Sequence, residues 1–125
     1  QSFVCRIPEG VFYTGDFRWS SEAVLNILKN CMEHTPRKGT VGVQARKTGI
    51  FTEIVIEDNG SGLSPEDIPH LFDRFYKGKN SSEHSFGIGL ALSRMIISRQ
   101  NGVIKAENRK EGGARFILRF YHGVV

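Results

Sequence analysis

Residues 54–63 read Ile-Val-Ile-Glu-Asp-Asn-Gly-Ser-Gly-Leu, and an expected β-strand gives way to a loop in the middle of this stretch. The β-branched residues before Asp58 favour a strand, and the glycines after it favour a loop. A carboxylate there can accept a hydrogen bond from an amino group. Gly60 and Gly62 lack a Cβ, so their backbone can lie flush against a flat ligand. We therefore predict that this loop binds adenine.

A second glycine-rich stretch, Phe-Gly-Ile-Gly-Leu at residues 86–90, opens an expected helix over residues 87–101. Free backbone N–H groups and the positive end of the helix dipole make such a start suitable for phosphate. The stretch is not a P-loop, because no Gly-Lys-Ser or Gly-Lys-Thr follows. It also matches the dinucleotide-binding fingerprint poorly, because Leu92 stands at the third glycine position. Its interpretation as a phosphate site therefore depends on the first loop.

The strongest helix pattern covers residues 20–35, with Ser20 or Ser21 as its cap and Pro36 as its end. Apolar residues at helical spacing define the side of each helix that we expect to be buried. For the first helix these residues are Val24, Leu25, Leu28 and Met32, and for the second they are Leu90, Leu92, Met95 and Ile96.

A stripe of polar side chains spaced by four residues runs along the first helix and consists of Glu22, Asn26, Asn30 and His34. The stripe is either a solvated face or a row of groups directed at a ligand. Asparagine is a poor helix-interior residue, so two of them one turn apart are unusual. Together with the glycine loops, this favours the ligand interpretation. The amide oxygen of Asn30 suits Mg²⁺, and Arg74, Lys77 and Lys79 are either phosphate-neutralising or merely solvated.

The rest of the chain predicts one strand-rich domain built from 125 residues. A short helix is expected after Ser64-Pro65, with Pro69 limiting its length. The strands are expected over residues 2–7, 11–17, 40–47, 50–58, 103–108 and 114–121, and the third and fourth of them form a hairpin through Thr48-Gly49.

Composition bounds the class of protein and its partners. The chain is 39% apolar and 24% charged, no signal peptide is visible in the given residues, and no apolar run approaches the ~20 residues of a membrane helix. The net charge of +4 is spread out, so we expect an anionic small ligand rather than a nucleic acid. Cys5 and Cys31 lack metal-type spacing, and Cys31 is expected to be a buried free thiol, not half of a disulfide, in a reducing compartment.

Four motifs occur in order and at workable spacings. They are Asn-Ile-Leu-Lys-Asn-Cys-Met-Glu-His-Thr at 26–35, Asp-Asn-Gly-Ser-Gly at 58–62, Phe-Asp-Arg-Phe-Tyr-Lys at 72–77 and Gly-Ile-Gly-Leu at 87–90. With these N, G1, F and G2 boxes the chain resembles, from about residue 17 to 121, the catalytic ATP-binding domain of bacterial sensor histidine kinases. These domains belong to the GHKL superfamily and have the Bergerat fold. The resemblance implies an α+β two-layer sandwich. A mixed, mostly antiparallel sheet of about five strands would be covered on one face by about three helices.

The resemblance also implies roles for individual residues. Asp58 would accept the adenine amino group, with Gly60 and Gly62 shaping the pocket. Asn30 would bind Mg²⁺ and Asn26 would face the phosphates, and both would be catalytic residues. Residues 72–87 would form the ATP lid, in which Arg74 is the third catalytic candidate. The other residues implied in nucleotide binding are His34, Leu63, Tyr76, Lys77, Gly87, Ile88, Gly89 and Leu90.

The chain departs from the family pattern at two places, and a further position separates kinases from hydrolases within the superfamily. Glu33 stands where many members carry lysine against the phosphates, so Arg74 or a lid lysine is expected to make that contact. Ser85-Phe86 replaces a Gly-Thr-Gly beginning, which leaves a shorter lid with one fewer glycine. Asn26 stands where the hydrolysing members carry the glutamate that activates water, and an amide cannot take a proton at neutral pH.

The resemblance implies ATP and Mg²⁺ as cofactors and a histidine on a helical dimerisation domain as phosphate acceptor, with a response regulator downstream. That domain, the sensor and any membrane segment are expected upstream of Gln1, and this cytoplasmic piece alone is expected to be a monomer. None of the four histidines shows an acceptor pattern. The alternatives are a hydrolase or serine-directed kinase of the same fold, and a degenerate domain that senses nucleotide without catalysis.

Overall fold

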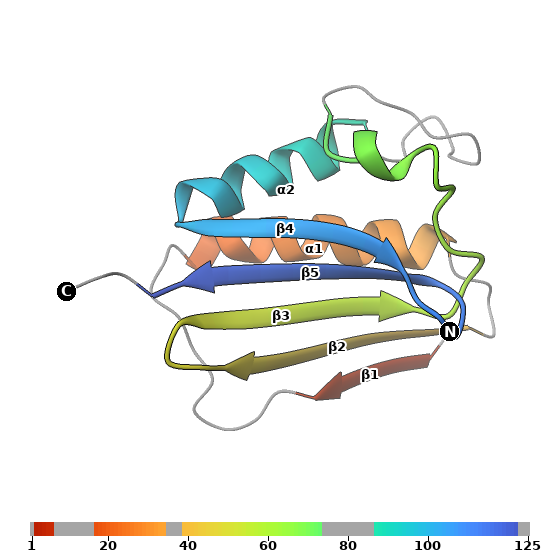
Figure 1. Cartoon of the computed structure of the whole chain (residues 1–125), viewed down its shortest axis with the longest axis horizontal. Coiled ribbons are helices and arrows are strands. Elements are labelled where there is room, and N and C mark those ends of the chain that lie inside the picture. Colours follow the sequence, from red (N-terminus) through yellow and green to blue (C-terminus); the bar gives the residue numbers. More distant parts are fainter. Residues whose placement is uncertain (1, 7–16, 35–38, 74–86, 123–125) are drawn as a thin grey trace.

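The computed structural model describes residues 2–6, 17–34, 39–73 and 87–122. Five strands form one sheet in the order β1-β2-β3-β5-β4 (Figure 1). The strands are β1 (Ser2–Arg6), β2 (Thr40–Lys47), β3 (Phe51–Asp58), β4 (Gly102–Asn108) and β5 (Ala114–Tyr121). β1 lies parallel to β2 at one edge, and all other neighbours are antiparallel. The predicted mixed, mostly antiparallel sheet is therefore confirmed.

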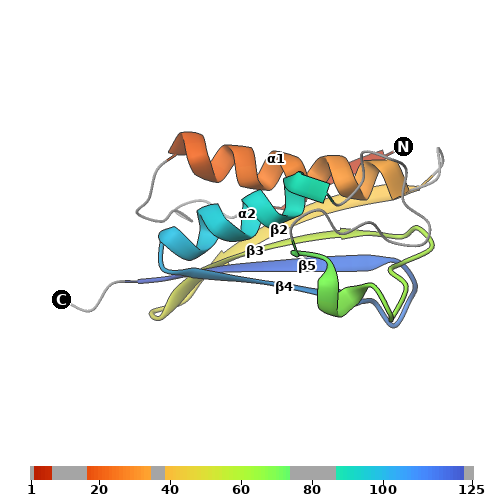
Figure 2. The same ribbon diagram turned by 90° about the horizontal axis from the view of Figure 1, so that it is seen from above.

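Two α-helices, α1 (Phe17–His34) and α2 (Gly87–Arg99), lie side by side on one face of this sheet (Figures 1 and 2). The helix predicted after Ser64 is only a 3-10 turn at Ile68–His70. Pro69 has no backbone N–H with which to extend a helical ladder from the preceding turn. The two-layer sandwich is confirmed, with two α-helices and one 3-10 turn in the described part. No helix there is long and apolar enough to cross a membrane.

The core lies between the helices and the inward faces of β2, β3 and β5. Burial along β5 alternates strictly, as expected for a strand with one face against helices. The most deeply buried apolar residues are Ala23, Ile27, Cys31, Leu90 and Ile97 from the helices, Val41, Ile56, Phe116 and Leu118 from the strands, and Leu71, which follows the 3-10 turn.

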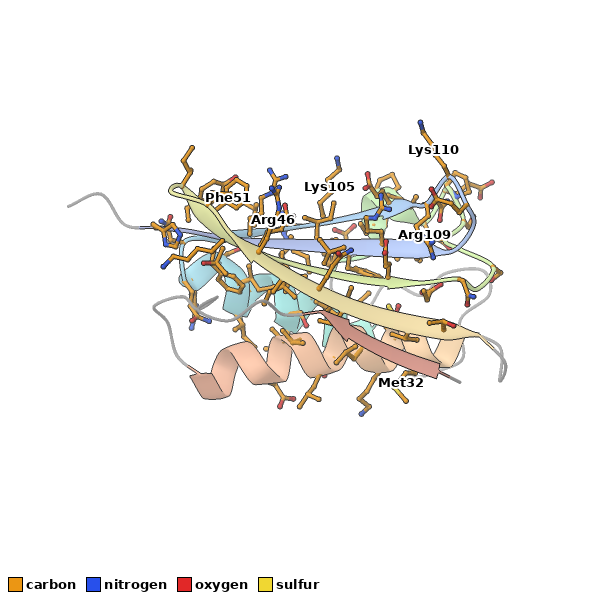
Figure 3. The ribbon with its side chains drawn as sticks, turned by 90° about the horizontal axis from the view of Figure 1, so that it is seen from below. Met32, Arg46, Phe51, Lys105, Arg109 and Lys110 are labelled. Atoms are coloured by element: carbon orange, nitrogen blue, oxygen red, sulfur yellow. The ribbon has the colours of Figure 1, made fainter. Side chains whose placement is uncertain are left out.

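The buried side predicted for α1 is partly wrong. The side chains of Leu25 and Met32 are 53% and 50% exposed, and Figure 3 shows Met32 directed away from the sheet. Smaller residues, Ala23 and Cys31, lie in the core instead. Their size allows close packing, and the Ser93 hydroxyl of α2 donates a hydrogen bond of 3.0 Å to the Ala23 carbonyl. Helical spacing therefore identified Val24 and Leu28, which pack partly buried against the core, but not the residues that the contact between α1 and α2 places deepest.

Three further expectations need correction. In α2, Met95 is 46% exposed, and Ile97 is buried in its place. The helix α1 begins at Phe17, before the predicted Ser20 cap, so the strand predicted over residues 11–17 is wrong at its last residue. Residues 11–16 lie outside the described part of the chain. At the other end of α2, Asn101 has a φ of 59°, the left-handed conformation typical of a helix end.

Candidate functional site

Three segments of the predicted site lie toward the same end of the molecule. They are the C-terminal part of α1, the loop after β3 and the N-terminus of α2 (Figure 1). The first two are in direct contact, because the Cys31 thiol of α1 donates a hydrogen bond to the Asp58 carboxylate at the end of β3. The fold therefore brings together sequence motifs that are separated by up to 60 residues.

Asp58 is 2% exposed and is held by neutral donors. Its Oδ1 accepts the backbone N–H of Gly60 at 2.9 Å and that of Ala114 at 3.2 Å. Its own backbone carbonyl accepts Nη1 of Arg109 at 2.8 Å. A carboxylate offers about four acceptor positions. The group thus has a fixed orientation and retains capacity for a further donor, such as the amino group of a base.

The glycine loop owes its shape to Gly62. This residue has a φ of 82°, and a Cβ placed on it would lie 2.9 Å from Oδ1 of Asn108. Leu63, the next residue, is buried, and its backbone N–H and carbonyl are both bonded to the Asn108 side chain, at 2.7 and 2.8 Å. At Gly60 the backbone N–H closes a turn onto Asp58. The loop is thus defined by backbone hydrogen bonds at both of its ends.

The polar stripe of α1 passes from solvent into the protein. Glu22 is exposed, Asn26 is half-buried and Asn30 is 6% exposed. A side chain that is 6% exposed does not belong to a solvated face, so that alternative is wrong for Asn30. The side chain of His34 lies outside the described residues. The amide oxygen of Asn30 is a metal ligand of the kind that Mg²⁺ prefers.

Cys31 lies one residue beyond Asn30 and faces the core. It is a free, buried cysteine, as predicted, while the side chain of Cys5 is not described. Burial raises the pKa of the Cys31 thiol, and the negative charge of Asp58 and the hydrogen bond to it raise that pKa further. The thiol therefore keeps its proton at neutral pH and remains a donor to Asp58.

The lid and the second glycine motif are covered only in part. Arg74, Tyr76 and Lys77 lie outside the described residues. Gly87, Ile88 and Gly89 form the first turn of α2. The side chain of Leu90 is 1% exposed and packs in the core, so its backbone N–H is the group that it can offer to a phosphate.

The β4–β5 turn contributes residues that sequence reasoning missed. Asn108, Arg109 and Ala114 all donate hydrogen bonds to the segment from Asp58 to Leu63. Gly113 packs so closely against Asp58 that an added Cβ would lie 1.9 Å from the Asp58 carbonyl oxygen. The pair Gly112-Gly113 was the available signal, but adjacent glycines are also typical of a tight turn alone, so the sequence indicated the turn and not its contact with Asp58.

A hollow of about 300 Å³ lies on the opposite, helix-free face of the sheet. It is lined by Thr40, Gly42, Val43, Gln44, Glu57, Asn59 and Arg109. The helix α1, which carries Asn30, and the helix α2 lie on the other side of the sheet, so this hollow is separate from the predicted nucleotide site (Figure 2).

Comparison with known proteins agrees with this arrangement. Residues 15–123 match the family described as histidine kinase-, DNA gyrase B- and HSP90-like ATPases. The sensor protein SphS of Synechococcus elongatus is 31% identical over 119 residues, covering 88% of this chain and 29% of SphS. The chain thus spans less than a third of this relative's length.

Solved structures show the same fold. The mycobacterial sensor histidine kinase MprB superposes with a TM-score of 0.86 and 25% identity, covering 96% of this chain and 82% of that one. Full-length ShkA in complex with AMPPNP gives a TM-score of 0.79 at 18% identity and covers 99% of this chain and 26% of that one. The protein belongs to the histidine kinase-, DNA gyrase B- and HSP90-like ATPase family, as an ATP-binding domain of the sensor histidine kinase type.

Proposed function

We propose that this domain binds Mg-ATP and donates the γ-phosphoryl group to a histidine on a separate helical dimerisation domain, from which a response regulator receives it. The observation that carries the proposal is Asp58. It is a buried carboxylate whose hydrogen bonds come from neutral groups, and it lies beside the asparagine-bearing helix. Such a group can accept a hydrogen bond from the amino group of adenine without first breaking an ion pair with a cationic side chain.

The phosphates would lie between α1 and the start of α2. Backbone N–H groups of Gly87 to Leu90 and the dipole of α2 would receive them. Mg²⁺ would take one oxygen from Asn30 and the others from phosphate and water, and it would neutralise charge on the transferring group. Arg74 of the lid is proposed to face the same phosphoryl group. The ShkA structure, which contains an ATP analogue, supports nucleotide binding by this fold.

The character of α1 favours transfer over hydrolysis. Asn26 lies one turn before Asn30, where a general base would have to stand, and a neutral amide does not accept a proton. Glu22 is exposed and lies eight residues from Asn30, about 12 Å along the helix. The domain would thus hold ATP for an outside nucleophile. The acceptor domain and any sensor or membrane segment would belong to a longer protein with this part in the cytoplasm.

The test is labelled-ATP transfer to an added phosphoacceptor domain, together with calorimetric titration of ATP in the presence and absence of Mg²⁺. We expect Mg²⁺-dependent binding and an acid-labile, alkali-stable label on the acceptor. Asn30→Ala should abolish transfer, whereas the exposed Lys110→Ala should leave it unchanged. Steady phosphate release would favour a hydrolase, and an acid-stable label would favour a serine-directed kinase. Absence of ATP binding would refute the proposal altogether.

A further inference from the structure

The turn between β4 and β5 contacts both ends of the loop that carries Asp58. One contact is made by Arg109, whose Nη1 donates to the backbone carbonyl of Asp58 at 2.8 Å. The other is made by Asn108, which bonds to the backbone of Leu63. The loop is therefore fixed at its first and last residues by two consecutive side chains that are 45 or more residues away in sequence.

Asn108 pairs with Leu63 in the way that one peptide group pairs with another. Its Oδ1 accepts the Leu63 N–H at 2.7 Å, and its Nδ2 donates to the Leu63 carbonyl at 2.8 Å. The same Oδ1 occupies the space that a Cβ on Gly62 would require. The amide of Asn108 thus satisfies two backbone groups of the loop and determines its path at Gly62.

Arg109 holds the opposite end and is itself held in place. Its Nε lies 3.4 Å from a carboxylate oxygen of Glu111 and 3.7 Å from one of Glu57. Its backbone N–H donates to the Gly113 carbonyl at 2.9 Å, and Gly113 packs directly on Asp58. The guanidinium contacts the backbone of Asp58 and leaves the carboxylate to neutral donors.

We propose that Asn108 and Arg109 are positioning residues for base recognition, which fix the Asp58 loop so that its carboxylate selects a purine bearing a 6-amino group over one bearing a 6-oxo group. The inference rests on the proposed nucleotide site. A carboxylate accepts from an amino group, but it repels a carbonyl oxygen at the same position. This discrimination requires a fixed carboxylate, because a mobile one can turn away from the carbonyl.

The test compares the affinities of Mg-ATP and Mg-inosine triphosphate, which differ at this position of the base. Wild type should prefer ATP. Asn108→Ala loses both bonds to Leu63, and we expect its ATP affinity to fall about tenfold while inosine triphosphate affinity falls less, so that the preference shrinks. Arg109→Lys keeps the charge beside Glu57 and Glu111 but loses the guanidinium bond, and it should shift the preference in the same direction.

Two further variants separate positioning from general loss of structure. Lys110→Ala alters the neighbouring residue, which points away from the sheet in Figure 3, and it should keep the wild-type preference. Asn108→Asp retains an acceptor for the Leu63 N–H but not the donor, and it should fall between wild type and Asn108→Ala. Partial unfolding lowers both affinities equally and leaves their ratio unchanged, so the ratio reports positioning even where stability falls.

The outcomes are distinct for this inference and for the proposed function. If wild type binds ATP but the ratio stays unchanged in Asn108→Ala, Asn108→Asp and Arg109→Lys, the positioning role is overturned and the proposed function stands. If wild type binds neither nucleotide, both are overturned. A reduced ratio in these three variants, with the wild-type ratio in Lys110→Ala, supports the inference.

Discussion

Strand β3 carries two buried carboxylates, Asp58 and Glu53, on opposite faces of the sheet. Asp58 faces the helices and accepts hydrogen bonds from neutral groups. Glu53 faces the helix-free side, where Nε of Arg46 lies 2.8 Å from one oxygen and Nε of Arg119 lies 2.7 Å from the other. Both arginines also approach the ring of Phe51, at 5.5 and 4.6 Å from its centroid (Figure 3 labels Arg46 and Phe51).

The two carboxylates show how one strand can carry a group that we propose for ligand recognition and a group that holds strands together. Two guanidinium groups occupy the oxygens of Glu53 on both sides, so that carboxylate serves to hold neighbouring strands together. The described donors to the Asp58 carboxylate are neutral, because backbone amides and the Cys31 thiol orient it without neutralising it. Burial is similar, at 2% for Asp58 and 6% for Glu53, so the different roles that we propose for them rest on the identity of their donors.

The largest expected effect on stability comes from adding a Cβ at Gly113, which packs against the backbone of Asp58. Gly113→Ala would place a Cβ 1.9 Å from the Asp58 carbonyl oxygen at a φ of 93°. We expect a loss of about 3–5 kcal/mol in the free energy of unfolding, from backbone strain and overpacking together. Gly112→Ala is the matched control, because its φ of 103° carries similar strain in open space. It should cost only about 1–2 kcal/mol. Equal losses in urea titrations would show that Gly113 has no packing role.

Neutralising each carboxylate should divide the two roles. Asp58→Asn should weaken ATP binding by about 1–3 kcal/mol, because an amide can present a donor to the adenine amino group. Glu53→Gln should lower the free energy of unfolding by about 1–3 kcal/mol, with ATP affinity unchanged, because two guanidinium groups lose a charged partner. Calorimetry and urea unfolding measure the two effects. A loss of ATP affinity in Glu53→Gln would remove the distinction between the faces.

Acid should affect Glu53 in a predictable direction. The hydrogen bond from Arg46, followed by that from Arg119, lowers the pKa of Glu53 despite its burial. Its contribution to stability is therefore fully present above the usual glutamate pKa of about 4.3 and is lost as pH falls through the lowered value. The difference in unfolding free energy between wild type and Glu53→Gln should shrink below that pH. A constant difference down to pH 2 would contradict the role of the ion pair.

Alkaline pH should lower the free energy of unfolding through Cys31, whose thiol donates to Asp58. This is the smallest of the expected effects. The raised pKa keeps the thiol protonated in the folded state, while the unfolded thiol loses its proton above about pH 8.5. The unfolded state then binds fewer protons, so this group lowers stability by up to about 1.4 kcal/mol per pH unit above that point. Cys31→Ala should show a shallower decline in unfolding free energy between pH 8.5 and 10. If wild type and Cys31→Ala lose unfolding free energy at the same rate with pH, burial and the Asp58 charge do not raise the pKa of this thiol.

Several features could be predicted because their signals are local. The bounds of β2 and β5 agree with the prediction, since alternation of apolar and polar residues is a property of each strand alone. The loop after Asp58 was located because a carboxylate and two glycines follow a β-branched run. The stripe through Asn26 and Asn30 followed from the helical period, and burial of Asn30 confirmed that it enters the protein.

Other features required the folded chain. The sequence of α1 could not show that Ala23, rather than Leu25 or Met32, would face the core, because that depends on how closely α2 approaches. In the sequence, Asn108 is only the last residue of an expected strand. Its contacts with residues 62 and 63 depend on the folded chain.

The amino-acid sequence by itself determined the bounds of β2 and β5 and the end of β3 at which Asp58 stands, because propensity and periodicity act within a few residues. The order of the four motifs is also a property of the sequence, and the resemblance that these motifs carry implied the class of fold. The tertiary structure alone decided that the turn at residues 108–114 supports the Asp58 loop. It also decided that Glu53, five residues earlier on the same strand, is held by arginines. Those contacts join segments up to 66 residues apart, and only the pairing of strands sets which side chains meet.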